Sequence, residues 1–454
     1  MTKTKTQYVC QSCGAASPKW MGQCLDCNAW NTLVEERVEA LKSKMTGHYA
    51  GATSLAVVSL NEVSIREYTR VLLGMSELDR VVGGGLVPGS VTLIGGDPGI
   101  GKSSLLLQVL ANLSLDYPVL YVSGEESLDQ IALRAKRMGL KTDQFQLLAE
   151  TSVHGIIEAV KKHKPKMLVI DSIQTMQVED LSGAPGGVTQ VRESAALLTK
   201  MAKTLNVSVF LVGHVTKSGE VAGPRVLEHI VDTVVYLEGQ QDGRYRLLRA
   251  LKNRFGPVNE LGVFAMTDRG LKEVKNPSAI FLSRGEILPG SAVVNIWEGT
   301  RPLLLEVQAL VDDNHFGAPK RLAIGYDANR LNMLLAILHK HGGMQIGMQD
   351  VFVNVVGGVK ITETSADLGI LLALISSFKN KVLPQDLVVF GEVGLSGEIR
   401  PVPYGPERLS EALKHGFKKA LIPKANKTSL IPKGLEVHTV QNVQEVLQRL
   451  QDFF

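Results

Sequence analysis

The sequence predicts a mixed α/β fold that is divided into several domains. Its 454 residues are enough for about two to four domains, because one domain usually takes roughly 100–200 residues. Residues 91–94 form an apolar strand pattern that is followed by a glycine-rich loop and a helical apolar pattern, which is the element order of an α/β unit. Beyond residue 285 the strand and helix patterns become shorter, which indicates a further α/β domain.

The composition is that of a folded globular protein. Hydrophobic residues make up 44% of the chain and charged residues 21%, and these values argue against a disordered, collagen-like or coiled-coil chain. The formal net charge of +4 permits a nucleic-acid partner without requiring one. The 44 glycines indicate many tight turns or loops that surround phosphate groups.

The chain shows no pattern of export or of membrane insertion. Its first ten residues contain two lysines but no apolar run of the kind that a signal peptide has. Apolar runs such as residues 368–375 are far shorter than the roughly 18 residues of a transmembrane helix. We therefore expect a cytoplasmic protein with no membrane segment.

All four cysteines lie within the first 27 residues, in the pattern C-x2-C-x10-C-x2-C. They are Cys10, Cys13, Cys24 and Cys27. A two-residue spacer lets both thiolates of a pair point to one side of a tight turn, and two such turns supply the tetrahedral sulfur set that Zn²⁺ prefers. Disulfides or redox pairs are the alternative, but a redox pair normally follows a strand, and we expect no strand before Cys10. The sequence predicts a structural zinc finger over residues 1–34 and a linker over residues 35–61.

The strand pattern at residues 91–94 leads into a G-x4-G-K-S phosphate-binding loop. Its glycines allow backbone N–H groups to converge on phosphates, Lys102 reaches the β- and γ-phosphate oxygens, and the Ser103 hydroxyl coordinates Mg²⁺. The loop recognises phosphates and not the base. The predicted contact residues are Gly96, Asp97, Pro98, Gly99, Ile100, Gly101, Lys102 and Ser103.

Hydrolysis of a nucleotide also needs two carboxylates at strand ends beside this loop, one for the metal and one for the attacking water. The apolar run KMLVID ends at Asp171, the expected Mg²⁺ ligand. The run PVLYVSG is followed by Glu125 and Glu126, and we favour Glu125 for water activation because it comes first beyond the strand. A later strand brings His214 to the same edge, either as a γ-phosphate sensor or DNA relay, or as a buried or capping histidine.

Residues 72–106 resemble the RecA/KaiC class of ATPases, which has similar Leu-Asp, triple-glycine and Pro-Gly elements ahead of the loop. The segment KNRFG at residues 252–256 resembles the signature of the RadA (Sms) family of bacterial DNA repair and recombination proteins. With the cysteine finger and the C-terminal region, this resemblance covers essentially the whole chain. It implies a RecA-like P-loop ATPase domain over residues 62–275, with ATP as the nucleotide and Glu125 as the catalytic glutamate.

The resemblance also implies a homohexameric, DNA-dependent ATPase and helicase that works with RecA in recombinational repair. Such a protein loads on single-stranded and branched DNA and promotes branch migration. In ring ATPases a cation from the neighbouring subunit stabilises charge on the γ-phosphate, and Lys252 and Arg254 fit this role, although a basic turn in water is the alternative. Lys217, Arg225 and Lys252 are the cations that we expect to contact DNA.

Residues 285–454 resemble the Lon protease domain, which RadA proteins carry. In Lon-type proteases a serine at the start of a helix is activated by a lysine, and here Ser365 stands at the serine position and Arg408 at the lysine position. An arginine stays protonated and cannot act as the neutral base of a Ser–Lys dyad, which argues against proteolysis. We expect Ser365 to be the N-cap of the helix that follows it.

The C-terminal region also contains a basic stretch, because residues 412–435 include six lysines and no Asp or Glu. Such a cluster suits a phosphate backbone, while a solvated lysine face and a surface for ring assembly are the alternatives. Two other classes of function stay open at this point. One is an ATP-dependent Lon-type serine protease, and the other is a KaiC-like signalling or scaffold ATPase that does not touch DNA.

Overall fold

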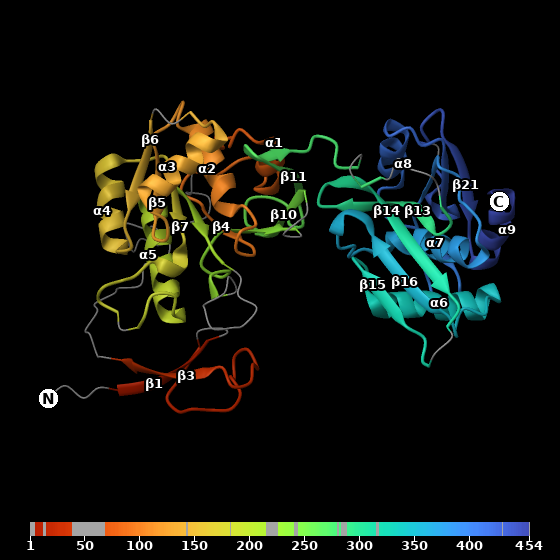
Figure 1. The fold of residues 1–454 in the computed structure, drawn as a ribbon, viewed down its shortest axis with the longest axis horizontal. Coiled ribbons are helices and arrows are strands. Elements are labelled where there is room, and N and C mark those ends of the chain that lie inside the picture. Colours follow the sequence, from red (N-terminus) through yellow and green to blue (C-terminus); the bar gives the residue numbers. More distant parts are fainter. Residues whose placement is uncertain are drawn as a thin grey trace, which may run out of the picture. The chain divides into compact units, whose positions relative to one another are not determined.

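The chain folds into two compact units, Met1–Val274 and Lys275–Phe454 (Figure 1). The computed structural model describes residues 5–11, 15–38, 69–141, 144–181, 183–214, 226–239, 244–278, 281–282, 288–314, 317–428 and 430–453. Within these ranges no helix is long and apolar enough to cross a membrane.

The cysteine-containing segment forms a small antiparallel sheet in the order β2-β1-β3. Its strands are β1 (Lys5–Cys10), β2 (Ala16–Ser17) and β3 (Leu33–Val38). The expectation that no strand precedes Cys10 is therefore wrong. The strand pairs with antiparallel neighbours and not with the parallel strands of a redox domain, so the sulfur chemistry does not change.

The centre of the first unit is a nine-stranded sheet in the order β12-β11-β10-β9-β4-β8-β7-β5-β6. The strands from β6 to β9 pair in parallel, and β9 to β12 pair antiparallel. Parallel pairing brings the carboxyl ends of β4, β5, β7 and β8 to one edge of the sheet. The strands are β4 (Val91–Gly95), β5 (Val119–Ser123), β6 (Phe145–Ala149), β7 (Met167–Asp171), β8 (Ser208–Val212), β9 (Thr233–Glu238), β10 (Tyr245–Asn253), β11 (Leu261–Thr267) and β12 (Gly270–Glu273).

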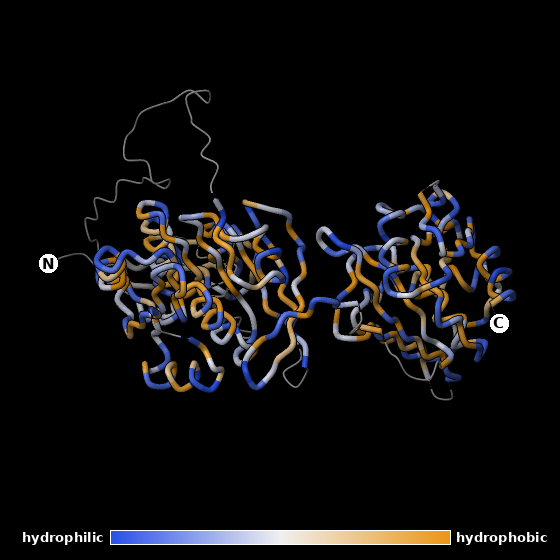
Figure 2. The backbone as a smooth tube through the Cα atoms, turned by 90° about the horizontal axis from the view of Figure 1, so that it is seen from above, coloured by the Kyte–Doolittle hydropathy of each residue, from blue (hydrophilic) through white to orange (hydrophobic). Residues whose placement is uncertain are grey.

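Helices cover both faces of this sheet. The helices are α1 (Ser76–Val81), α2 (Lys102–Leu113), α3 (Leu128–Met138), α4 (Val153–His163) and α5 (Val188–Leu205). Alternate residues of one strand enter opposite cores: in β5, Tyr121 belongs to the core that contains residues of α1, α2 and α3, and Val122 to the core that contains residues of α4 and α5. Because both faces are covered, β4, β5, β7 and β8 are buried along their whole length. Figure 2 shows orange, hydrophobic stretches of the tube in the interior of each unit.

Local sequence signals place the two helices that flank the nucleotide loop. Helix α2 begins directly after Gly101, whose φ of +114° favours glycine. Helix α3 begins with a capping box between Ser127 and Gln130 and ends at Gly139 in the left-handed conformation. The loop between β5 and α3 is therefore fixed where it enters α3, and the Ser123 hydroxyl, which accepts from the Glu126 N–H at 2.9 Å, fixes its other end.

The second unit has a seven-stranded mixed sheet in the order β15-β16-β14-β13-β17-β20-β21 and a separate β18-β19 ribbon. The strands are β13 (Ser291–Glu298), β14 (Arg301–Asp312), β15 (Arg321–Ile324), β16 (Asp350–Val355), β17 (Leu387–Val389), β18 (Glu392–Val393), β19 (Ile399–Arg400), β20 (Lys419–Pro423) and β21 (Glu436–Val440). The helices are α6 (Ala328–Gly342), α7 (Asp367–Lys379), α8 (Gly405–Lys414) and α9 (Val443–Phe453).

A buried guanidinium group joins α8 to the centre of the second unit. Arg408 is 0% exposed and binds both carboxylate oxygens of Glu363 at 3.0 Å. It also donates to the backbone oxygens of Asn295 at 2.6 Å and of Pro403 at 2.9 Å. This fork-shaped pairing satisfies a charge that could not otherwise be buried.

The expectation for Ser365 is wrong in detail. Helix α7 begins at Asp367 with Ala366 at its N-cap position, and no side chain caps it. A short 3-10 turn over Thr364–Ala366 comes first. The Ser365 hydroxyl instead donates to Glu363 and accepts from Arg408 at 3.2 Å, because the turn directs it toward the buried ion pair.

Replacing Arg408 by methionine should destabilise the second unit by about 3 kcal/mol, because it leaves the Glu363 carboxylate without its partner. Arg400 provides a matched control, since its side chain is 56% exposed in its ion pairs and Arg400→Met should change stability little. Denaturant unfolding followed by Trp297 fluorescence, with Trp20 and Trp30 replaced by phenylalanine, measures both. Equal stability of the two variants would contradict a stabilising role for the buried pair.

Candidate nucleotide-binding site

The predicted nucleotide-site residues meet at the carboxyl edge of the parallel sheet. The loop after β4 carries Lys102, and β7 ends at Asp171. Ser123, the last residue of β5, pairs in register with Asp171, so Glu125 follows on the neighbouring strand. His214 comes two residues after β8. One sheet edge therefore collects the loop, both acids and the histidine.

The loop after β4 has the shape and charge that phosphate groups need. Gly96 approaches the neighbouring strand so closely that a Cβ there would lie 2.5 Å from the Leu237 oxygen. The buried Lys102 ammonium donates to the backbone oxygens of Gly96 at 2.8 Å and Asp97 at 3.0 Å. Burial lowers the pKa of Lys102, and the charges of Asp171, Asp97 and Glu125 oppose this shift. An ammonium, a helix N-terminus and a glycine-rich backbone fit phosphate oxygens.

A tyrosine that we did not single out from the sequence holds the predicted metal ligand. Tyr121 lies in the middle of β5, and its hydroxyl donates to the Asp171 carboxylate. Burial, followed by the charge of Asp171, raises the pKa of Tyr121 well above its usual value, so the tyrosine keeps its proton and remains a donor. A tyrosine inside an otherwise aliphatic strand is the sequence signal that could have identified it.

The two candidate acids after β5 have different surroundings. Glu125 accepts a hydrogen bond from the Ser172 hydroxyl at 2.5 Å, and His214 Nε2 lies 3.3 Å from the same carboxylate. The hydrogen bond with His214, and then that with Ser172, lowers the pKa of Glu125 against the effect of burial. Glu126 instead forms an ion pair with Arg134 on α3. Glu125 is therefore held at the sheet edge beside Ser172, the residue after Asp171, while Glu126 is occupied by its arginine partner. A carboxylate in this position is the kind of group that accepts a proton from water.

Lys252 and Arg254 lie at the opposite end of the sheet from the phosphate loop of their own chain. Asn253, between them, pairs with Thr233 at the start of β9, and Thr233 pairs with Thr92 at the start of β4. Lys252 donates to the backbone oxygens of Glu228 and Val231. Burial lowers the pKa of Lys252.

The arginine of this pair also has a partner in its own subunit. Arg254 binds the buried Asp232 at 3.1 Å, and its own side chain is 50% exposed. The structure thus does not bring either cation to the phosphate loop of the same subunit.

Three predicted site residues lie outside the described residues: Cys13, Lys217 and Arg225. Around Lys217 and Arg225, the described residues end at His214 and resume at Val226.

The three described cysteines form a sulfur cluster. The sulfur atoms of Cys10, Cys24 and Cys27 all lie within 4.8 Å of one another. The two pairs have matching turns, because Cys10 N–H donates to the Ala15 oxygen and Cys24 N–H to the Ala29 oxygen, each at 2.9 Å. Cys10 and Cys24 are buried and Cys27 is exposed. Sulfurs that converge from two similar turns are the ligand type that zinc takes in structural sites.

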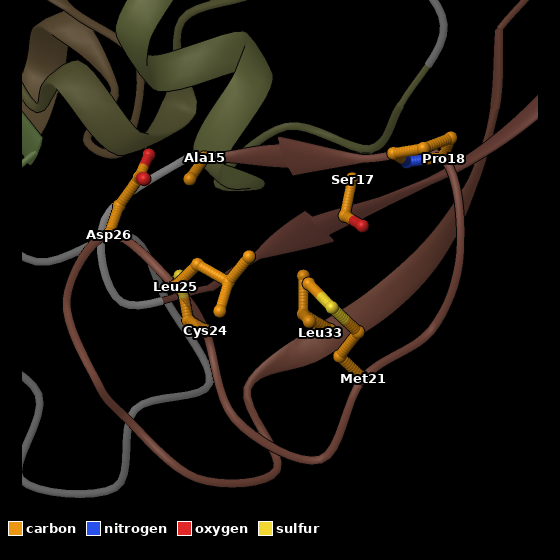
Figure 3. A pocket seen from close by; sticks show the side chains of 8 residues that line it. All are labelled: Ala15, Ser17, Pro18, Met21, Cys24, Leu25, Asp26 and Leu33. Atoms are coloured by element: carbon orange, nitrogen blue, oxygen red, sulfur yellow. The ribbon is translucent and has the colours of Figure 1, made fainter.

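A pocket of about 180 Å³ lies beside this sulfur cluster. Figure 3 shows Met21, Leu25 and Leu33 around it, with Cys24 next to Leu25. The pocket is lined by the turn that carries the second cysteine pair and by residues of β2 and β3, so it borders the sulfur cluster.

Comparisons with protein families agree with these assignments. Residues 74–220 match the AAA domain, residues 8–35 the rubredoxin metal binding domain, and residues 328–426 the family of subunit ChlI of Mg-chelatase. The AAA match and the phosphate loop identify ATP and Mg²⁺ as cofactors, and the rubredoxin-type match and the sulfur cluster identify zinc. The predicted three-part α/β architecture is confirmed.

Full-length relatives are similar to the whole chain. DNA repair protein RadA of Pseudomonas aeruginosa is 59% identical over 99% of this chain and 100% of its own length. The proteins of the same name from Escherichia coli and Bacillus subtilis are 55% and 48% identical, each over 99% of both chains. A solved KaiC-like protein from Pyrococcus horikoshii covers 46% of this chain and 99% of its own, with 20% identity and a TM-score of 0.39.

Replacing Cys24 by serine should remove the bound zinc, because a hydroxyl is a poor zinc ligand and the remaining sulfurs do not complete the set. Nucleotide binding should persist, since the ATP site is built on a different sheet. Metal content per chain, measured by mass spectrometry, tests this together with binding of a fluorescent ATP analogue. Asp26→Asn, which changes an exposed acid beside Cys27, should keep its zinc. Full metal content in Cys24→Ser would contradict ligation by this sulfur.

Proposed function

Because the chain belongs to the family of the DNA repair protein RadA, we propose that it is a DNA-dependent ATPase and helicase of recombinational repair. It promotes branch migration of recombination intermediates alongside RecA, as a cytoplasmic homohexamer. The observation that carries the proposal is the meeting of Lys102, Asp171 and Glu125 at one edge of a parallel sheet.

Hydrolysis follows from the geometry at this edge. Lys102 binds the β- and γ-phosphate oxygens of ATP, beside the backbone N–H groups of the glycine-rich loop. The Glu125 carboxylate accepts a proton from a water molecule as the water oxygen bonds to the γ-phosphorus, and the bond to the β–γ bridging oxygen breaks. Ser172 and His214 hold that carboxylate in place.

Ser103 and Asp171 are the residues that would hold Mg²⁺. When it is bound, the ion neutralises charge on the β- and γ-phosphate oxygens. Tyr121 orients the Asp171 carboxylate, so one oxygen of the acid already accepts a hydrogen bond. This leaves the other oxygen for the metal or for its water ligands.

Lys252 and Arg254 act on the site of a neighbouring subunit. Their position at the amino end of β4 removes them from the phosphate loop of their own chain, and a cation is needed where charge develops on the γ-phosphate. Lys252 is fixed by two carbonyl oxygens and Arg254 by Asp232. Both cations are therefore held in defined positions at one edge of the subunit.

Single-stranded and branched DNA binds to the segments that follow β7 and β8, through Lys217 and Arg225, and Lys252 contacts DNA from the other end of the sheet. His214 precedes the second segment and lies beside Glu125. Gln174, in the first segment, donates to the His214 oxygen at 3.3 Å. Through these contacts, DNA bound to either segment can change the position of Glu125, the acid that activates water.

Proteolysis does not gain support. The Ser365 hydroxyl is bound to Glu363 and to the permanently charged Arg408, so no neutral base lies beside it in the described part of the second unit. A scaffold ATPase that ignores DNA differs from the proposal in one measurable respect, because its hydrolysis rate would not respond to DNA.

Single-stranded DNA should raise the rate of ATP hydrolysis by the wild-type chain. Lys102→Ala should lose hydrolysis by about 100-fold or more, because a cation that stabilises the transition state is missing. Lys136→Ala, an exposed lysine on α3, is the matched control and should hydrolyse ATP at the wild-type rate. A wild-type rate that DNA leaves unchanged would favour the scaffold function.

Subunit mixing tests whether Lys252 acts between subunits. Lys252→Ala and Lys102→Ala should each be inactive alone, but a mixture should recover a measurable fraction of activity. In mixed rings some intact phosphate loops face an intact Lys252 of the next subunit. A mixture as inactive as its components would contradict action in trans.

A further inference from the structure

The second unit presents an exposed aromatic ring on a layered support. The ring of Tyr404 stacks on the ring of Trp297, with centroids 4.1 Å apart and an interplanar angle of 18°. On the buried side, the Arg408 guanidinium lies 5.9 Å from the centroid of Trp297. Tyr404 itself remains 53% exposed. A charged group, an indole and a phenol therefore form a stack that ends in solvent.

The backbone at Tyr404 holds the ring in this position at a cost. Tyr404 has a φ of +61°, a left-handed conformation that a bulky residue rarely adopts. Five of the other non-glycine residues with positive φ are asparagines and one is a lysine, in agreement with the weaker penalty for asparagine. A glycine or asparagine would fit this backbone more easily, and the stack on Trp297 is a contact that only an aromatic ring makes here.

A turn that carries two lysines is hydrogen-bonded to the segment that leads into Tyr404. The Asn426 side chain accepts from the Val402 N–H at 2.9 Å and donates to the Val402 oxygen at 2.7 Å. These two hydrogen bonds fix the turn that carries Lys424 and Lys427 next to the turn that carries Tyr404. Both lysines are exposed, and they belong to the stretch 412–435, which contains no acid.

The chemistry of this surface favours one kind of ligand. An exposed aromatic ring accepts the face of any nucleobase, and neighbouring lysines bind the backbone that joins the bases. Glu407 is exposed in the first turn of α8, and its negative charge repels phosphate groups. The phosphates of a bound strand should therefore lie near Lys424 and Lys427. Bases of a duplex are stacked on one another and cannot reach such a ring, whereas those of a single strand can.

We propose that Tyr404 is a stacking platform for an unpaired base of single-stranded DNA, with Lys424 and Lys427 on the adjacent phosphates. This inference rests on the proposed function, because DNA is its partner there. It adds a base-contacting site on the second unit to the segments that follow β7 and β8 in the first.

Equilibrium binding of two labelled oligonucleotides to the full-length zinc-containing protein tests the platform. One is oligothymidylate, and the other has the same length and phosphates but abasic sugars. Wild type should bind the thymidylate more tightly, and Tyr404→Leu should lose about tenfold in that affinity with little change toward the abasic strand. Tyr404→Phe should bind as wild type does, because the ring remains.

Two further variants complete the design. Lys424→Ala with Lys427→Ala should weaken binding of both oligonucleotides and reduce its salt dependence. Tyr117→Leu, which removes a tyrosine that is 39% exposed in the first unit, is the matched control and should bind as wild type. Thermal melting of Tyr404→Leu and Tyr404→Phe shows whether the second unit stays folded.

The outcomes separate this inference from the proposed function. Absence of thymidylate binding by wild type would contradict both. Binding by wild type with an unchanged Tyr404→Leu affinity would overturn the platform alone. A photo-crosslink from a bromodeoxyuridine oligonucleotide to the peptide that contains Tyr404 supports it even if Tyr404→Leu unfolds, and a crosslink that never reaches this peptide overturns it.

Discussion

Parallel pairing of the central strands is the constraint on which the ATP site depends. The register that sets Ser123 beside Asp171, and β4 between β8 and β9, brings loops that are far apart in the chain to one sheet edge. A shift by one residue would turn Tyr121 away from Asp171, because neighbouring residues of a strand face opposite sides. The apolar layers on both faces hold this register, so the geometry of the ATP site depends on the packing of the core.

The second unit uses the same principle of burial for a different purpose. At the position where a Lon-type dyad would need a neutral lysine, Arg408 is buried and bound to Glu363 and Ser365. A buried guanidinium needs acceptors for its donors, and the Ser365 hydroxyl is one of the acceptors around Arg408. These residues form part of a structural core, and Trp297, on which Tyr404 stacks, lies beside the Arg408 guanidinium.

Local patterns could predict the residues whose roles depend on neighbours in the sequence. The phosphate loop, Asp171 at its strand end and the cysteine spacing belong to this group. Contacts between distant segments could not be predicted in this way. Tyr121 on β5 contacts Asp171 on the neighbouring strand β7, and Arg408 on α8 binds Glu363, which is 45 residues earlier in the chain. The error at Ser365 has the same origin, because its position before a helix suggested a cap, while its tertiary partners decided its orientation. The strand before Cys10 was missed because its alternating polar residues give a weak apolar signal.

The central claim is that ATP hydrolysis at Glu125 drives movement of DNA strands. Extension of a branched three-strand junction by the purified protein measures this directly, with Glu125→Gln as the variant that keeps the fold and the ATP site but lacks the proton acceptor. Wild type should extend the junction only with ATP, and Glu125→Gln should not extend it. Wild-type protein that hydrolyses ATP on this substrate and leaves the junction in place would contradict coupling of hydrolysis to strand movement.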